Sequence, residues 1–147
     1  MPMPASTHQP DPATLRLAYA GLLPFVLGAL LIWIVRPEVH PYVAAALSAY
    51  AGVIVSFLGG IHWGLGFRAQ PADRARFTWG VVPSLVAWVA VVMPPYAGLV
   101  VQGVMLVACY LVDRRVYPVQ ASGSWLVMRF RLTVVASLAC FIGAAGS

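Results

Sequence analysis

His62 is the residue whose type and position are best suited to chemistry, because it alone among the histidines lies inside a long apolar run. Asp113 closes another such run. A carboxylate that pairs with an imidazole fixes its tautomer, as a proton relay or a general base requires. The sequence therefore directs attention to the surroundings of His62.

Several further side chains are expected at the same depth as His62, at the ends of neighbouring apolar runs. An alternative places His62 and Trp63 in the aromatic belt of the membrane interface and pairs Asp113 with a neighbouring arginine. An intramembrane enzyme with His62 as its base is a third hypothesis. If the side chains at this depth converge around His62, seven residues form a ligand-binding pocket in the cytoplasmic leaflet: His62, Trp63, Ser84, Tyr110, Asp113, Arg114 and Arg129.

Several chemistries do not fit the sequence. A haem with two histidine ligands needs both at one depth, whereas His8 and His40 lie outside the apolar runs. Zinc needs a cluster of Cys, His or carboxylate ligands, and Schiff-base chemistry needs a lysine; the sequence has neither. Cys109 and Cys140 are expected to be buried thiols that act as small hydrophobes. We therefore expect no catalytic residues, no metal and no cofactor.

Composition indicates which elements hold these residues. The chain has 147 residues, of which 61% are hydrophobic and 9% charged, and its mean hydropathy is +0.86. Five spans of about 20 residues each account for most of this length and leave no room for a separate soluble catalytic domain. We predict an all-α, polytopic membrane bundle of five transmembrane helices, at residues 15–35, 42–67, 78–93, 96–112 and 125–146.

The domain organisation follows from the same pattern. Residues 1–11 carry three prolines and are expected to form a disordered cytoplasmic tail. Residues 12–147 form a single transmembrane domain. Asp11 and Pro12 are typical of a helix N-cap followed by proline at the first helical position. The sequence before this run has no basic region, so we expect the first span to be retained and not cleaved.

The arginines predict the orientation. All nine basic residues are arginines, and the net charge is +5. Five helices place the N-terminus and the connections at residues 68–77 and 113–124 on one side, with eight arginines, while Arg36 alone lies on the other. This distribution places the N-terminus in the cytoplasm and the C-terminus outside. It also explains the positive charge without nucleic-acid binding.

The second span carries a row of small residues that recur every four positions. Such a row lets another helix approach closely in a membrane, and the partner is either another helix of this chain or another copy of the protein. Gln102 is expected to donate a hydrogen bond between helices. The row consists of Ala44, Ser48, Gly52, Ser56, Gly60 and Gly64.

A weak internal repeat is also present. The sequence Gly-Leu-Leu-Pro at residues 21–24 is followed by Gly-Val-Val-Pro at residues 80–83, and each run leads through a Pro-Tyr pair into the next span. Parallel repeats with proline-interrupted helices occur in transporters. The alternative is chance similarity between apolar segments.

Four motifs carry a resemblance to a known family. They are Gly-Leu-Leu-Pro-Phe at residues 21–25, Ser-Phe-Leu-Gly-Gly-Ile-His-Trp-Gly at 56–64, Trp-Gly-Val-Val-Pro-Ser-Leu-Val-Ala-Trp at 79–88 and Tyr-Leu-Val-Asp at 110–113. The chain resembles the proteobacterial and mitochondrial family of small multispanning membrane proteins that includes transmembrane protein 69. The resemblance implies an inner-membrane location, bacterial or mitochondrial, and brings no activity or catalytic residues.

Two functions are compatible with these features. The leading hypothesis is a non-enzymatic structural, assembly or accessory component of a complex in the bacterial inner membrane. The alternative is a small binder or transporter of an apolar ligand, a quinone or a lipid, that uses the pocket around His62. The expected partners are the lipid bilayer and another membrane protein or further copies of the chain, and no nucleic acid.

Overall fold

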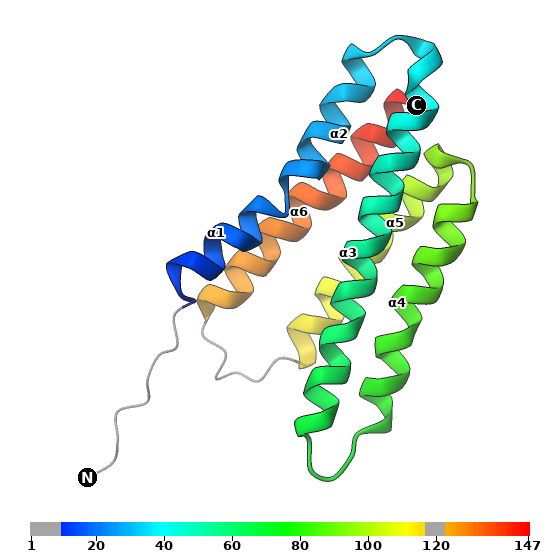
Figure 1. The fold of residues 1–147 in the computed structure, drawn as a ribbon. Helices are drawn as coiled ribbons and strands as arrows, with labels where there is room; N and C mark the ends of the chain where they lie inside the picture. The colour runs from blue at the N-terminus through cyan, green and yellow to red at the C-terminus, as the bar shows by residue number, and fades with distance from the viewer. Residues whose placement is uncertain (1–9, 117–122) are drawn as a thin grey trace.

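The computed structural model describes residues 10–116 and 123–147. Within these residues the chain forms helices and no strand. The helices pack side by side in an elongated bundle (Figure 1). In chain order they are α1 (Pro12–Ala20), α2 (Leu23–Ile34), the short 3-10 helix η1 (Pro37–Val39), α3 (His40–Arg68), α4 (Arg74–Val92), α5 (Pro95–Val116) and α6 (Gly123–Gly146).

Five helical segments of the described chain are long and apolar enough to cross a membrane. Helices α1 and α2 together form the first, and α3, η1 included, α4, α5 and α6 form the others. The prediction of an all-α bundle with five transmembrane helices is therefore confirmed. Helix α1 begins at Pro12 as predicted, although the Asp11 side chain makes no capping hydrogen bond. Of the tail predicted for residues 1–11, residues 1–9 lie outside the described residues.

The first span is two helices, where the sequence predicted one. Pro24 has no N–H for the helical ladder, and its ring clashes with the preceding turn, so the helix breaks just before it. At the break, Tyr50 Oη donates a hydrogen bond of 2.7 Å to the Gly21 carbonyl oxygen. The similarly placed Pro83 lies inside an unbroken α4. The two Gly-x-x-Pro segments therefore have different local structures.

Two helix ends differ from the prediction in a way that affects the site. Helix α4 begins at Arg74 because the Asp73 side chain accepts a hydrogen bond from the Ala75 N–H at 3.0 Å, which caps the first turn. Helix α5 continues to Val116. Asp113 therefore lies inside a helix and does not close it.

Helix α3 is central, and α2, α4, α5 and α6 all pack against it. The core contains large apolar side chains such as Phe25, Ile32 and Leu106. Cys109 and Cys140 are free thiols buried in this core, as predicted. Gln102 on α5 is fully buried and donates to the Ala87 carbonyl oxygen of α4 at 3.3 Å. The prediction that it donates between helices is therefore confirmed.

The predicted row of small residues packs inside this bundle only in its first half. Ala44, Ser48 and Gly52 are buried, and Ser56 is half-buried. Gly60 and Gly64 are exposed, and nothing lies within 4 Å of the position where either would carry a Cβ. The reason is geometric: with 3.6 residues per turn, every fourth residue advances about 40° around the helix. The row therefore turns away from the core.

Gly59 takes the place of Gly60 in the close packing between α3 and α4. A Cβ on Gly59 would lie 2.5 Å from the Gly80 carbonyl oxygen. A Cβ on Gly66, two turns further along the same face of α3, would lie 2.8 Å from the Phe77 ring. Glycine is therefore needed at both positions to let α4 approach.

The helix ends are distributed between the two ends of the bundle as five antiparallel spans predict. The start of α1, the α3–α4 connection and the end of α5 lie at one end of the bundle, and the C-terminus lies at the other (Figure 1). The arginine-rich segments therefore share one end, with Arg36 at the opposite one.

Candidate ligand-binding site

Three helices bring together a buried cluster of charged and polar side chains: His62 from α3, Asp113 from α5 and Arg129 from α6. His62 Nε2 lies 2.8 Å from Asp113 Oδ1. Arg129 donates to Asp113 Oδ2 from Nη2 at 2.8 Å and from Nε at 3.2 Å. An ionised carboxylate only accepts hydrogen bonds, so Nε2 of His62 carries the proton in this contact.

Thr133, one turn along α6, completes the cluster. Arg129 Nη1 donates to Thr133 Oγ1 at 2.9 Å, and Thr133 Oγ1 donates to the Arg129 carbonyl oxygen, also at 2.9 Å. The guanidinium group is therefore held from two sides. Asp113 and Thr133 together fix its direction within the bundle.

Burial makes the pairing within this cluster necessary. Asp113 is 0% exposed and His62 1% exposed, and the Arg129 side chain is 11% exposed. His62 stands six residues before the end of α3, and Arg129 six residues after the start of α6, which is about 9 Å of helix in each case. Charges at this depth are costly unless they are paired inside the bundle. The Asp113–Arg129 contact meets that requirement.

Trp79 on α4 adds a fourth helix to the surroundings of His62. The two rings meet edge to face with their centroids 6.5 Å apart. Trp79 Nε1 is buried and has no hydrogen-bond partner among the described residues. The indole therefore covers His62 from the side of α4.

Four of the seven predicted residues lie away from this cluster. Trp63 is 40% exposed and donates from Nε1 to the Phe77 carbonyl oxygen at 3.0 Å. Tyr110 is half-buried and packs against the Phe130 ring, with ring centroids 5.7 Å apart. Ser84 is half-buried on α4, and Arg114 is exposed.

Each of the two interpretations of His62 agrees with part of the geometry, and the ligand-binding role of the seven residues stays a prediction. Trp63 occupies the exposed position that the interfacial belt predicts, and Asp113 pairs with an arginine, Arg129. His62 itself is buried and pairs with Asp113, as the pocket interpretation requires. Neighbours on a helix point about 100° apart, so His62 and Trp63 cannot both face the core.

A cavity of about 630 Å³ lies beside the cluster, between α1 and the rest of the bundle. Its walls come from α1, α2, α3, α5 and α6 and are mostly apolar, with Phe25, Phe57 and Leu106 among them. Arg129 and Thr133 line it directly, whereas His62 and Asp113 reach it only through Arg129. The sequence does not predict this cavity, because the cavity depends on the position of α1 relative to α3.

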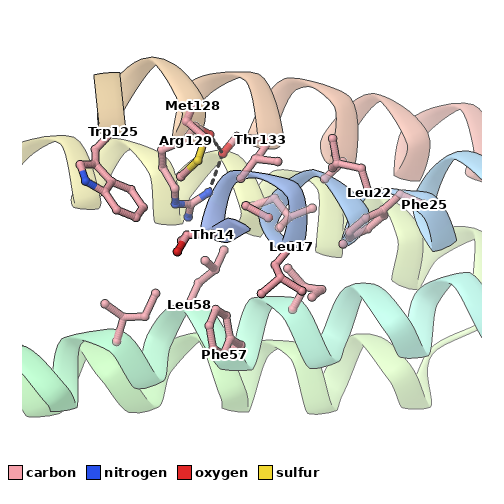
Figure 2. A pocket seen from close by; sticks show the side chains of 17 residues that line it. Thr14, Leu17, Leu22, Phe25, Phe57, Leu58, Trp125, Met128, Arg129 and Thr133 are labelled. Carbon is pink, nitrogen blue, oxygen red and sulfur yellow. Dashed lines mark hydrogen bonds between the residues drawn. The ribbon is translucent and has the colours of Figure 1, made fainter. Parts of the chain in front are cut away.

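The polar groups of the cavity gather at one end. Figure 2 shows Arg129 with Thr14 and Trp125 at that end, while Leu22 and Phe25 lie at the other. Helix α1 contributes no buried residue. Leu17 lines the cavity and is nevertheless 76% exposed, so the wall formed by α1 is open to the surroundings of the bundle.

These features define a multi-pass membrane helix bundle with a buried ion pair beside an apolar cavity. Sequence comparisons assign the chain to a family. The chain belongs to the family described as "Protein of unknown function (DUF3429)", which matches residues 10–145. The resemblance drawn from the four motifs is thereby confirmed.

Two curated relatives have the same name. The chain is 38% identical over 135 residues to transmembrane protein 69 of Xenopus tropicalis, covering 86% of this chain and 51% of the relative. It is 35% identical over 85 residues to transmembrane protein 69 of Mus musculus, covering 56% of this chain and 34% of the relative. The chain thus spans about half the length of the first relative and about a third of the second. No solved structure matches the chain.

Proposed function

We propose that the protein binds a membrane-dissolved amphiphile, a quinone or a lipid, in the cavity between α1 and α3. The observation that carries this proposal is the composition of the cavity: about 630 Å³ with apolar walls, and Arg129 and Thr133 at one end. Ligand sites of about 300–1,000 Å³ with apolar walls and a few convergent polar groups are typical of small-molecule binding. An apolar tail would lie along the walls and the head near Arg129.

The open wall at α1 supports access from the bilayer. Helix α1 has no buried residue, and the helical segment is interrupted after it, at Gly21 and Leu22. A tail dissolved in the hydrocarbon layer would enter between α1 and α3 without crossing water. This route suits a ligand that partitions into the membrane, and it would be slow for a polar solute.

His62 and Asp113 act in this proposal as positioning residues. Neither lines the cavity, but Asp113 holds the guanidinium of Arg129 and His62 holds the other carboxylate oxygen. A ligand head therefore meets a donor group whose direction is already fixed. Such preorganisation reduces the ordering that binding would otherwise require.

Native mass spectrometry of the full chain, extracted from its own membranes in mild detergent, tests this function. We expect one discrete small apolar mass to be retained by the wild-type protein. Ala18→Phe, which fills the cavity from α1, should lose it, and Ala13→Phe on the exposed side of α1 should keep it. Equal retention by both variants, or no retained mass in the wild type, would contradict the proposal.

We propose further that the chain lies in a bacterial inner membrane with its N-terminus in the cytoplasm. Eight of its nine arginines belong to the segments at the α1 end of the bundle, which supports this orientation. Reporter fusions at the C-terminus test it: alkaline phosphatase should be active and green fluorescent protein dark. The reverse pattern would overturn the orientation.

An accessory role in a larger membrane complex is the second candidate. It is supported by Gly60 and Gly64, which lie exposed on α3 with open space around them. A helix of a partner protein, or of a second copy, could approach closely there. The same mass spectrum would then contain a stoichiometric protein partner, and Gly60→Leu should release it. A lone chain would contradict this role.

A further inference from the structure

We infer that the head of the bound amphiphile is neutral and accepts hydrogen bonds through carbonyl oxygens, as quinones and diacylglycerols do, and carries no phosphate. This inference rests on the proposed function. The observation behind it is that Arg129, the one ionisable side chain among the described residues that line the cavity, is already paired with a buried carboxylate.

Asp113 compensates the positive charge of Arg129 at the polar end of the cavity. Within residues 10–116 and 123–147, Arg129 is the only Asp, Glu, Lys, Arg or His that lines the cavity. Asp113, fully buried, contacts it at 2.8 Å and brings one negative charge to one positive charge. A phosphate head next to Arg129 would therefore meet a guanidinium group whose charge Asp113 already compensates, and it would stand close to a second anion. Placing two anions together in a medium of low dielectric is costly.

Hydrogen-bond donors are nevertheless present at this end. A guanidinium has five N–H donors, and three are used in the contacts with Asp113 and Thr133. The two others belong to the terminal nitrogens Nη1 and Nη2. A carbonyl oxygen can accept from them without adding charge. Because the pair is already neutral, such a head needs no counter-ion to enter.

Trp125 provides a flat apolar surface beside these donors. It lines the cavity at the end where Arg129 lies (Figure 2). A planar quinone ring could stack on the indole, whereas a diacylglycerol would present only its ester carbonyls. Both share the chemistry inferred here, and the experiment must distinguish them.

Competitive loading of the full chain tests the inference. Nanodiscs of phosphatidylcholine that contain the protein receive decylubiquinone, dioleoylglycerol and dioleoylphosphatidylglycerol at equal mole fractions, and native mass spectrometry counts what stays bound. We expect one of the two neutral amphiphiles to exceed phosphatidylglycerol by about tenfold, which corresponds to about 1.4 kcal/mol. Which of the two is retained identifies the source of the carbonyl head.

Asp113→Asn gives a second, independent signature. The substitution leaves Arg129 with an uncompensated charge, so retention of phosphatidylglycerol should rise about tenfold relative to wild type. Arg114→Gln removes an exposed arginine next to Asp113 in the sequence and should leave the preference unchanged. Wild-type competition alone decides the outcome if the Asn variant does not fold.

The possible results separate this inference from the function on which it rests. Preferential retention of phosphatidylglycerol by the wild-type chain would overturn the neutral head while leaving an amphiphile-binding cavity in place. Retention of phosphatidylcholine from the nanodisc in place of the three would likewise overturn the neutral head alone, and retention of no amphiphile at all would overturn both. Retention of a neutral amphiphile by wild type, with a shift toward phosphatidylglycerol in Asp113→Asn, is the result that supports the inference.

Discussion

The two sides of α3 differ in how closely other helices approach it. On the α4 side, Gly59 lies so close to Gly80 that a single added methyl group would meet its carbonyl oxygen. On the α1 side the chain leaves a cavity of about 630 Å³, and Leu17 remains largely exposed. The same helix thus makes a rigid contact on one face and an open one on the other. We interpret the first as the scaffold and the second as the functional face.

The buried ion pair lies between these two regions and should matter most for stability. Asp113→Ala leaves Arg129 and His62 without their carboxylate, and removal of one partner of a buried pair costs about 3–5 kcal/mol. Unfolding of the purified protein in mixed detergent micelles would measure the change in the free energy of unfolding. Arg114→Ala, at the exposed neighbouring position, should change it by less than about 0.5 kcal/mol. Similar losses in both variants would show that the pair does not hold the bundle.

The rigid face is tested by a pair of adjacent glycines. Gly59→Ala places a Cβ 2.5 Å from the Gly80 carbonyl oxygen, and overpacking of this kind costs about 1–3 kcal/mol. Gly60→Ala adds the same methyl group where nothing lies within 4 Å, so it should not destabilise the protein. The same unfolding assay compares them. Equal effects would mean that the α3–α4 contact is not as close as described.

The break in the first span should contribute less. Tyr50→Phe removes the hydrogen bond to the Gly21 carbonyl oxygen, which is worth about 0.5–1.5 kcal/mol. Hydrogen exchange of the backbone amides in α1 should become faster, because this bond ties the break at the end of α1 to α3. Tyr19→Phe, on α1 itself, serves as the control. Unchanged exchange in Tyr50→Phe would show that the break is held by other contacts.

The open face should tolerate change best. Ala18→Phe adds volume to a wall that is already loose, so the free energy of unfolding should change by less than about 0.5 kcal/mol. Binding of the amphiphile should nevertheless be lost, as proposed above. A large loss of stability in this variant would mean that α1 belongs to the rigid part of the bundle.

Much of the fold could be predicted from the sequence, because apolar length and arginine placement depend on local composition. The five spans and the burial of both cysteines follow from composition in this way. The convergence of His62, Asp113 and Arg129 was also predictable, because the connectivity puts the ends of α3 and α5 and the start of α6 at one end of the bundle.

What could not be predicted depends on rotation and tertiary contact. Trp63 and Arg114 are sequence neighbours of His62 and Asp113, but a step of one residue turns each side chain by about 100°. A strict four-residue spacing predicted Gly60 in the packing row and left out Gly59. Because every fourth residue advances about 40° around the helix, it is Gly59 that faces α4. Pro24 indicates where the helix of the first span breaks. The position of α1 relative to α3 depends in addition on tertiary contacts, such as the hydrogen bond from Tyr50 to the Gly21 carbonyl oxygen, which joins residues 29 apart in the sequence.

The central claim is that the α1 face, and not the α4 face, receives an amphiphile. Photo-crosslinking with diazirine-bearing analogues of decylubiquinone and dioleoylglycerol, followed by peptide mapping, tests it most directly. We predict that labels concentrate on cavity residues such as Ile61 and Met128. Trp88 and Val92, exposed on α4, should receive only the background labelling of any lipid-facing position. Equal labelling of the two faces would contradict the account.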